Sequence, residues 1–223
     1  MNTRHLDWFY SENIEKGTVR LSSDEARHLK VKRHYSDEQV CVFDGKGKIG
    51  IGKIVDKDKI EVSEIKEIQN DSFLTIASAV PKGERFDFML QKLTELNVST
   101  IIPMKTNRSV VIPNKIERYK RILIEACKQC KRAWLPELRQ VTDFNSVLKE
   151  KADVKIILDQ EGKRLEAIKG KALVLVGPEG GFTEEELKEA EKAGFTKASI
   201  GKLTLRTETA AISAVAIINS QNI

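Results

Sequence analysis

The stretch Leu173-Val-Leu-Val-Gly-Pro-Glu-Gly-Gly-Phe182, followed by Thr183-Glu-Glu-Glu186, organises the rest of this chain. Its short apolar run predicts a buried strand that ends at the Gly-Pro step. The two later glycines allow positive φ angles and let a ligand approach the backbone closely. Thr183 and Glu186 have the spacing of a capping box, so we expect a helix directly behind the loop. This order of strand, glycine loop and helix predicts a small-molecule site at the carboxyl end of a strand.

A second polar loop, Gly201-Lys-Leu-Thr-Leu-Arg-Thr-Glu-Thr-Ala210, follows soon after and also opens onto a helical pattern. Two such loops so close together predict one shared site. The first loop is not followed by Gly-Lys-Ser/Thr, so it is not a Walker A phosphate loop.

Two nucleotide-binding patterns occur earlier in the chain. Gly45–Gly50 satisfies GxGxxG, and Gly47–Lys53 satisfies the first part of a Walker A motif. Both motifs require a helix next, whereas Ile49–Val55 alternates like a strand. We therefore interpret Asp44-Gly45 as a hairpin turn and expect no nucleotide there.

Composition indicates a soluble, cytoplasmic protein. Charged residues make up 32% of the 223 residues, the apolar runs are short, and neither a signal peptide nor a membrane span is visible. The three cysteines, an odd number, argue against a disulfide framework. Cys127 and Cys130 fall on the apolar side of a predicted helix without a second ligand pair. We therefore expect buried thiols and no metal site.

The positive charge is concentrated in the middle of the chain. Residues 82–140 hold 13 Lys and Arg against 6 Asp and Glu, a net charge of +7, whereas the formal net charge of the whole chain is +5. Such a segment is typical of a surface that neutralises phosphates, and a solvated basic face is the alternative. The same two alternatives stand for the basic run Arg27–His34, which follows Ser23, the expected cap of a short helix.

The hydrophobic pattern divides the chain into two domains, with a boundary near Asn70–Phe73. Short β-type runs indicate a small barrel or sandwich over residues 1–71: Thr18–Leu21, Gln39–Phe43, Ile49–Val55 and Lys59–Ile65. Over residues 72–223, strands alternate with helices, which predicts an α/β domain with a largely parallel sheet. In this part we expect strands at Leu74–Val80, Val98–Met104, Leu138–Val141, Val154–Leu158, Ala172–Val176 and Lys197–Ile200. The fourth of these strands is expected to open a polar loop, Asp159–Gly162.

Several motifs, taken in order, resemble the RsmE-type ribosomal RNA methyltransferases of the SPOUT class. The matching segments are Lys82-Gly-Glu-Arg85, Lys92-Leu-Thr-Glu-Leu-Asn-Val98, Pro103, Thr106–Ser109, Glu125-Ala126 with Gln129, Arg132 and Pro136, Val176–Phe182 and Leu205–Ala210. Asn97 stands in place of a glycine of that pattern, and Leu203-Thr204 in place of Arg-Ile. Asn tolerates a positive φ, so a helix can still end at position 97.

The resemblance implies an amino-terminal PUA-like β-barrel that binds RNA and a carboxyl-terminal α/β domain with a trefoil knot. It also implies a homodimer that methylates N3 of a uridine in the 16S RNA of the small ribosomal subunit, with S-adenosylmethionine as cofactor. The residues expected to bind that cofactor are Leu175, Val176, Gly177, Pro178, Glu179, Gly180, Gly181, Ile200, Gly201, Leu203, Leu205, Arg206, Thr207 and Thr209.

Arg206 is the first candidate for a catalytic or substrate-orienting cation, because guanidinium can donate to a phosphate or to a uracil oxygen. Glu208 is a candidate base, with a helix-terminal ion pair as the alternative. The candidate RNA contacts are Arg27, Lys30, Arg33, Lys82, Arg85, Arg108 and Arg132.

Two other functions stay open at this point. One is another SPOUT reaction, such as ribose 2′-O-methylation of transfer RNA. The other is a non-catalytic RNA-binding or ribosome assembly factor.

Overall fold

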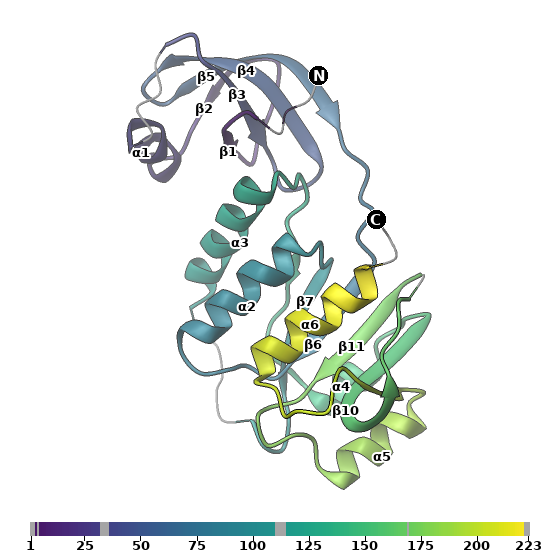
Figure 1. The fold of residues 1–223 in the computed structure, drawn as a ribbon. Coiled ribbons are helices and arrows are strands. Elements are labelled where there is room, and N and C mark those ends of the chain that lie inside the picture. The colour runs from purple at the N-terminus through teal and green to yellow at the C-terminus, as the bar shows by residue number, and fades with distance from the viewer. Residues whose placement is uncertain (1–2, 4, 32–35, 110–114, 169, 221–223) are drawn as a thin grey trace. The chain divides into compact units, whose positions relative to one another are not determined.

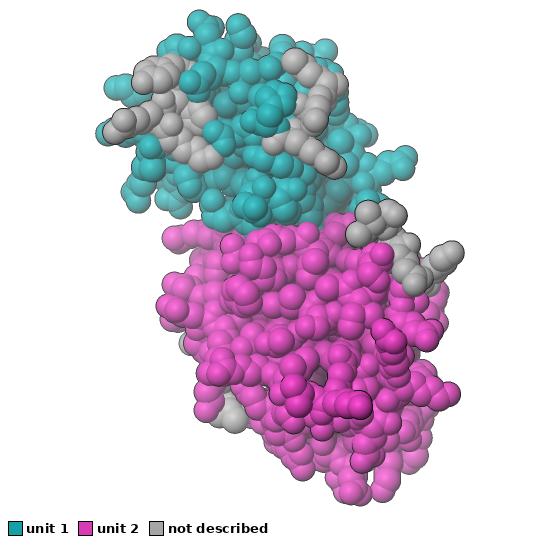
Figure 2. Space-filling view, in the orientation of Figure 1, with its two compact units in different colours: residues 1–71, 124–135 teal, residues 72–123, 136–223 magenta. Residues whose placement is uncertain are grey.

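The computed structural model describes residues 3, 5–31, 36–109, 115–168 and 170–220. The chain divides into two compact units, which Figure 2 shows in different colours. Unit 1 comprises residues 1–71 and 124–135, and unit 2 comprises residues 72–123 and 136–223. Unit 1 thus takes in a short segment from the middle of the chain besides the expected amino-terminal region. None of the described helices is long and apolar enough to cross a membrane.

The described residues of unit 1 form a five-stranded sheet with the order β1-β3-β4-β5-β2. Its pairs are antiparallel except for β1, which runs parallel to β3. The strands are β1 (Trp8–Tyr10), β2 (Gly17–Arg20), β3 (Gln39–Phe43), β4 (Lys48–Asp56) and β5 (Lys59–Glu67). The four strands expected in this region are confirmed, whereas β1 is too short to give a periodic signal.

The turn between β3 and β4 is the expected hairpin. Gly45 and Gly47 have φ angles of 73° and 98°, which only glycine adopts freely. The carboxylate of Asp44 accepts hydrogen bonds from the backbone N–H groups of Lys46 and Lys48 at 2.7 and 3.0 Å. These glycines therefore form part of a hairpin turn, and the GxGxxG pattern here does not mark a nucleotide-binding loop.

Helix α1 (Ser23–Val31) begins one residue later than its cap. The hydroxyl of Ser22 accepts from the backbone N–H of Glu25 at 3.3 Å, so Ser22 is the capping residue. The prediction of Ser23 as the cap was therefore wrong by one position, because two adjacent serines give the same sequence signal.

The described residues of unit 2 form a seven-stranded sheet in which every described pair is parallel. The order is β12-β10-β11-β6-β7-β8, and β9 also pairs with β7. The strands are β6 (Leu74–Ser78), β7 (Thr100–Lys105), β8 (Glu137–Leu138), β9 (Thr142–Asp143), β10 (Val154–Arg164), β11 (Ala172–Val176) and β12 (Thr196–Ser199). The predicted parallel sheet is confirmed. The strand expected at Leu138–Val141 is instead the two short strands β8 and β9.

Helices cover the sheet of unit 2, as the alternating pattern of strand and helix requires. Helices α2 (Glu84–Glu95) and α6 (Thr207–Asn219) lie side by side, and α6 contacts β6 and β11 (Figure 1). Helices α4 (Phe144–Leu148) and α5 (Glu184–Lys192) bury Phe144, Val147 and Ala190 in one cluster with Leu173 and Leu175 of β11. All five residues of β11 are buried, because the strand is covered on both faces, and its sequence is therefore apolar throughout.

Strand β10 differs from the prediction of a strand that ends at Leu158. Residues as far as Arg164 belong to it, and both Leu158 and Lys163 lie opposite Ala198 of β12. The four residues between them therefore leave the regular register. Polar residues are typical of such an excursion, so these four residues have the composition of the expected loop although they belong to the strand.

Helix α3 (Ile116–Cys130) contributes to both units, with residues 124–130 assigned to unit 1. Cys127 is buried, as expected, whereas Cys130 is only half-buried. Asn97 ends α2 with a φ of 62°, which confirms that it adopts the left-handed conformation expected of a glycine substitute.

Candidate functional site

A cavity of about 520 Å³ lies where β10, β11 and β12 end, and its volume is typical of a small-molecule site. Its walls come from the excursion of β10, the loop after β11 and the segment after β12. The described lining residues are Leu158, Asp159, Gln160, Glu161, Val176, Gly177, Pro178, Glu179, Gly180, Gly181, Phe182, Glu184, Leu187, Ala198, Ser199, Ile200, Gly201, Leu203, Thr204, Leu205, Thr207 and Ala210.

The glycine loop, residues 177–182, forms one wall. A Cβ at Gly177 would lie 3.1 Å from the ring of Phe182, so a larger residue would displace that buried ring. Gly181 has a φ of 69°, and its N–H donates to the carbonyl of Pro178 at 2.8 Å. The loop is therefore a tight turn whose shape depends on glycine at these two positions.

Helix α5 begins directly behind this loop with the predicted capping box, which is confirmed. The hydroxyl of Thr183 accepts from the backbone N–H of Glu186 at 3.2 Å, and Oε2 of Glu186 accepts from the N–H of Thr183 at 2.8 Å. The other oxygen, Oε1, accepts from the N–H of Asn107 at 2.8 Å. One buried carboxylate thus joins the glycine loop to the loop after β7.

Arg108 makes a second connection between the same two loops. Its guanidinium donates to the carbonyl oxygens of Gly180 and Phe182. The hydroxyl of Ser109 accepts from the N–H of Thr106 at 2.9 Å, which shapes the loop that carries Arg108. The expected polar loop at the end of β7 therefore supports the glycine loop.

The segment after β12 forms the opposite wall and returns the chain to the middle of the sheet. The side-chain amide of Gln160 donates to the hydroxyl of Thr204 at 2.9 Å. The hydroxyl of Thr207 donates to the carbonyl of Gly177 at 3.1 Å. Residues 200–206 thus pass between the β10 excursion and the glycine loop before α6 begins.

The charge of the cavity is negative. Four of its lining side chains are the acids Asp159, Glu161, Glu179 and Glu184, and the described lining includes neither Lys nor Arg. Apolar side chains such as Leu158, Ile200 and Leu205 complete the walls. This arrangement suits a ligand that combines a flat apolar group with positive charge.

Most residues expected to bind the cofactor line this cavity. These are Val176, Gly177, Pro178, Glu179, Gly180, Gly181, Ile200, Gly201, Leu203, Leu205 and Thr207. Three others do not line it: Leu175 is fully buried in the core, and Arg206 and Thr209 are exposed. Sequence reasoning did not include the β10 excursion, although its run of polar residues at the end of a strand was the available signal.

The two candidate catalytic residues lie at the start of α6 in different surroundings. Arg206 is the exposed N-cap residue, whereas Glu208 is buried. Oε1 of Glu208 lies 3.9 Å from Nε of Arg85, and Nη1 of Arg85 lies 3.5 Å from Oε1 of Glu179. Arg85 thus lies between a carboxylate of the glycine loop and a carboxylate of α6.

The candidate RNA contacts fall in both units. In unit 2, Lys82, Arg85 and Arg108 are exposed. In unit 1, Arg27 and Lys30 are exposed, and Arg132 is half-buried. Burial lowers the pKa of Arg132, which fits a structural cation better than a phosphate contact. Arg33 lies outside the described residues.

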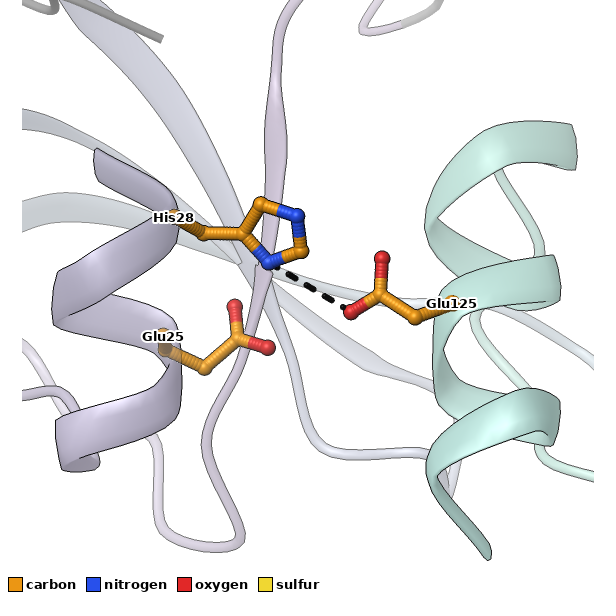
Figure 3. A group of neighbouring side chains, drawn as sticks. All are labelled: Glu25, His28 and Glu125. Atoms are coloured by element: carbon orange, nitrogen blue, oxygen red, sulfur yellow. Dashed lines mark ion pairs between the residues drawn. The ribbon is translucent and has the colours of Figure 1, made fainter. Parts of the chain in front are cut away.

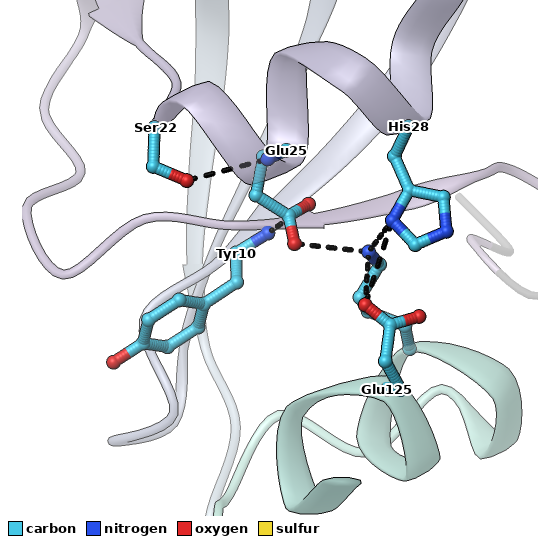
Figure 4. Close-up of polar contacts among 6 residues, drawn as sticks. Tyr10, Ser22, Glu25, His28 and Glu125 are labelled. Carbon is cyan, nitrogen blue, oxygen red and sulfur yellow. Dashed lines mark hydrogen bonds and ion pairs between the residues drawn. The ribbon is translucent and has the colours of Figure 1, made fainter. Parts of the chain in front are cut away.

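Unit 1 contains a cluster of polar side chains, none of which lines the cavity (Figure 3). Glu25 and His28 of α1 and Glu125 of α3 bring potential metal ligands within 4.8 Å of one another. However, the ammonium of Lys128 lies 2.9 Å from an oxygen of each carboxylate and 3.1 Å from Nδ1 of His28 (Figure 4). The lysine therefore already supplies the positive charge that a metal ion would bring.

Comparison with known proteins matches both parts of the chain to domain families of RNA methyltransferases. Residues 69–219 match the family model for an RNA methyltransferase domain, and residues 21–65 match an RNA methyltransferase PUA domain. These matches, with the structural likeness below, confirm the predicted fold class: a SPOUT-type α/β domain with a parallel sheet and a PUA-like amino-terminal domain.

Individual relatives cover almost the whole chain. Ribosomal RNA small subunit methyltransferase E of Aquifex aeolicus is 33% identical over 94% of this chain and 97% of its own length. The protein of the same name from Bacillus subtilis is 29% identical over 93% of this chain and 91% of its own length. The crystal structure of the Neisseria gonorrhoeae enzyme bound to S-adenosyl methionine is 32% identical, with a TM-score of 0.88 over 97% of this chain and 98% of that one.

Proposed function

We propose that this chain, which belongs to the ribosomal RNA small subunit methyltransferase E family, transfers a methyl group from S-adenosylmethionine to RNA of the small ribosomal subunit. The observation that carries the proposal is the cavity between the glycine loop and residues 200–207, in a fold that matches a relative bound to S-adenosyl methionine.

The residues of the cavity fit this cofactor. S-adenosylmethionine carries a positive sulfonium and an ammonium, and the four acidic side chains of the cavity complement that charge. Its adenine requires apolar walls and backbone hydrogen bonds, which Leu158, Ile200 and Leu205 and the two loops provide. When bound, the cofactor supplies an electrophilic methyl group.

The proposed target is N3 of a uridine in 16S RNA, as the family resemblance implies. This atom lies on the Watson–Crick edge, so the base must be unpaired or flipped out of its helix. The chain's contribution is to orient that base for in-line displacement and to neutralise its phosphates. The exposed cations Lys82, Arg85 and Arg108, around the glycine loop and α2, are the proposed RNA contacts of unit 2.

The proposal extends to a homodimer that works in the cytoplasm. Helix α6 is rich in Ala and Ile, and one of its faces leaves Ile212, Ala216 and Ile217 partly exposed. Such a face favours contact with a second copy. Sedimentation of the purified protein tests this part, because a monomer at micromolar concentration would contradict it.

Two measurements test the function. Calorimetry should detect binding of S-adenosylmethionine to the purified chain, and mass mapping should find one methyl mark on 16S RNA that depends on the protein. Failure to bind the cofactor would refute the methyltransferase proposal. A mark on ribose, or on transfer RNA, would instead identify a different reaction of the same cofactor.

A further inference from the structure

Arg108 lies along the glycine loop although the residue is exposed. Its Nη1 donates to the carbonyl oxygens of Gly180 and Phe182. A Cβ built on Gly180 would lie 3.4 Å from Cδ of Arg108, so the stem of the side chain also passes close to the loop. An exposed arginine more often extends its charged end into water. The two backbone carbonyls therefore hold this side chain against the glycine loop.

The backbone next to Arg108 is joined to the same loop. The N–H of Asn107 donates to Oε1 of Glu186 at 2.8 Å, and Oε2 of that carboxylate accepts from the N–H of Thr183, directly after the glycine loop. Glu186 is 3% exposed, so this connection is buried. The glycine loop therefore depends on the loop after β7 for its position.

The guanidinium of Arg108 keeps N–H donors for a second partner. Its Nη1 serves both carbonyls, and among the described residues no hydrogen bond or ion pair occupies its Nε or Nη2. These two nitrogens form one edge of the guanidinium, and such an edge binds two oxygens of a phosphate in parallel. Arg85, a second exposed cation, pairs with Glu179, so consecutive residues of the glycine loop each contact a cation.

We propose that Arg108 is a positioning residue that binds an RNA phosphate and the glycine loop together, so that RNA and S-adenosylmethionine each strengthen the binding of the other. This inference rests on the proposed function. A phosphate on the free edge fixes the guanidinium on the two carbonyls and thereby orders a wall of the cofactor cavity. A cofactor against that wall in turn fixes the guanidinium for the phosphate. Such coupling is reciprocal and has the same factor in both directions.

The test measures cofactor affinity with and without RNA. The cofactor probe is S-adenosylhomocysteine, which has no methyl group to transfer, so its complex with RNA does not react. The RNA probe is the small ribosomal subunit that lacks the mark. In equilibrium dialysis, saturating subunits should raise the affinity of the wild-type protein for the probe at least about fivefold. An unchanged affinity would overturn the proposal, as would a fall, which would mean that the phosphate withdraws Arg108 from the carbonyls.

Two variants assign the coupling to Arg108. Arg108→Lys keeps the charge but loses the planar fork, so we expect the coupling to fall below about twofold while affinity for subunits alone stays within about threefold. Lys105→Gln removes an exposed charge from the same loop, and among the described residues no hydrogen bond or ion pair joins that side chain to the glycine loop. This control should weaken subunit binding and keep the wild-type coupling.

Three results would overturn the role of Arg108. Full coupling in Arg108→Lys would show that the fork is not needed. An equal loss of cofactor affinity with and without subunits in that variant would indicate a structural role only. Loss of coupling in Lys105→Gln would assign the effect to the general charge of the surface.

The wild-type protein provides a measurement that needs no variant. Saturating S-adenosylhomocysteine should raise its affinity for the subunits by the same factor, and an unchanged affinity would overturn the proposal. Failure of the proposed function gives a different result, since the wild-type protein would then bind no S-adenosylmethionine at all. A chain that binds the cofactor and methylates the subunit without any coupling would refute only the role of Arg108.

Discussion

Replacement of Lys128 by Met should destabilise unit 1, because it removes the cation at the centre of a buried polar cluster. Lys128 is 9% exposed and Glu25 is 6% exposed, and their charged atoms are 2.9 Å apart. Met has a similar length and keeps most of the apolar packing. The variant therefore isolates the loss of the ammonium group.

The magnitude follows from what remains around Glu25. Breaking a buried ion pair by removal of one partner costs about 3–5 kcal/mol. The backbone N–H of Tyr10 still donates to Oε2 of Glu25 at 3.1 Å, so we expect the lower end, about 3 kcal/mol. The side chain of Glu125 is 49% exposed, so its pair with Lys128 should contribute less than about 1 kcal/mol.

The two tryptophans of the chain, Trp8 and Trp134, both belong to unit 1, so their fluorescence reports unfolding of that unit. Urea titrations of Lys128→Met, Glu125→Gln and the double variant Glu25→Gln/Lys128→Met would provide the free energies of unfolding. The double variant should recover much of the loss, because it leaves no unpaired buried charge.

Two results would refute this reasoning. One is a loss below about 1 kcal/mol in Lys128→Met, which would indicate that water already screens the cluster. The other is a loss of unfolding free energy in Glu125→Gln as large as that in Lys128→Met, which would mean that the stabilisation comes from the exposed pair of Lys128 with Glu125. Affinity for S-adenosylmethionine, which we propose to bind in the cavity of unit 2, serves as the control and should not change.

Three further predictions concern the cavity and the thiols. Gly177→Ala should lower affinity for S-adenosylmethionine at least about tenfold in calorimetry, because its methyl group displaces Phe182; unchanged affinity would show that the loop can adjust. Glu186→Gln should cost about 1–3 kcal/mol in thermal unfolding, because an amide NH₂ group would face one of two backbone N–H donors; no loss would mean that water replaces the carboxylate. Burial raises the pKa of the Cys127 thiol to about 12, so a thiol reagent at pH 8 should modify the half-buried Cys130 first, and equal reaction rates would contradict the burial. The free energy of unfolding should also fall as pH rises above the ordinary thiol pKa, because only the unfolded chain releases the Cys127 proton there.

Local signals account for the parts of the fold that were predicted correctly. The capping box at Thr183 and Glu186, the hairpin at Asp44 and the left-handed Asn97 each depend on residues close together in the chain. The boundaries of β10 were predicted less well, because a strand that leaves its register and returns has the composition of a loop. Strand β1, with three residues, carries no period to detect.

The sequence by itself determined the α/β class and the position of the glycine loop, because these follow from periodicity and from the special backbone of glycine. The family resemblance added half of the residues that line the cavity, 11 of 22. Only the tertiary structure showed that Arg108 donates to Gly180, 72 residues away, and that Lys128 pairs with Glu25, 103 residues away. It also showed that Glu208 is buried beside Arg85. Partners so distant along the chain meet only when the whole sheet and its helices have packed, and no local pattern records which charges will then be neighbours.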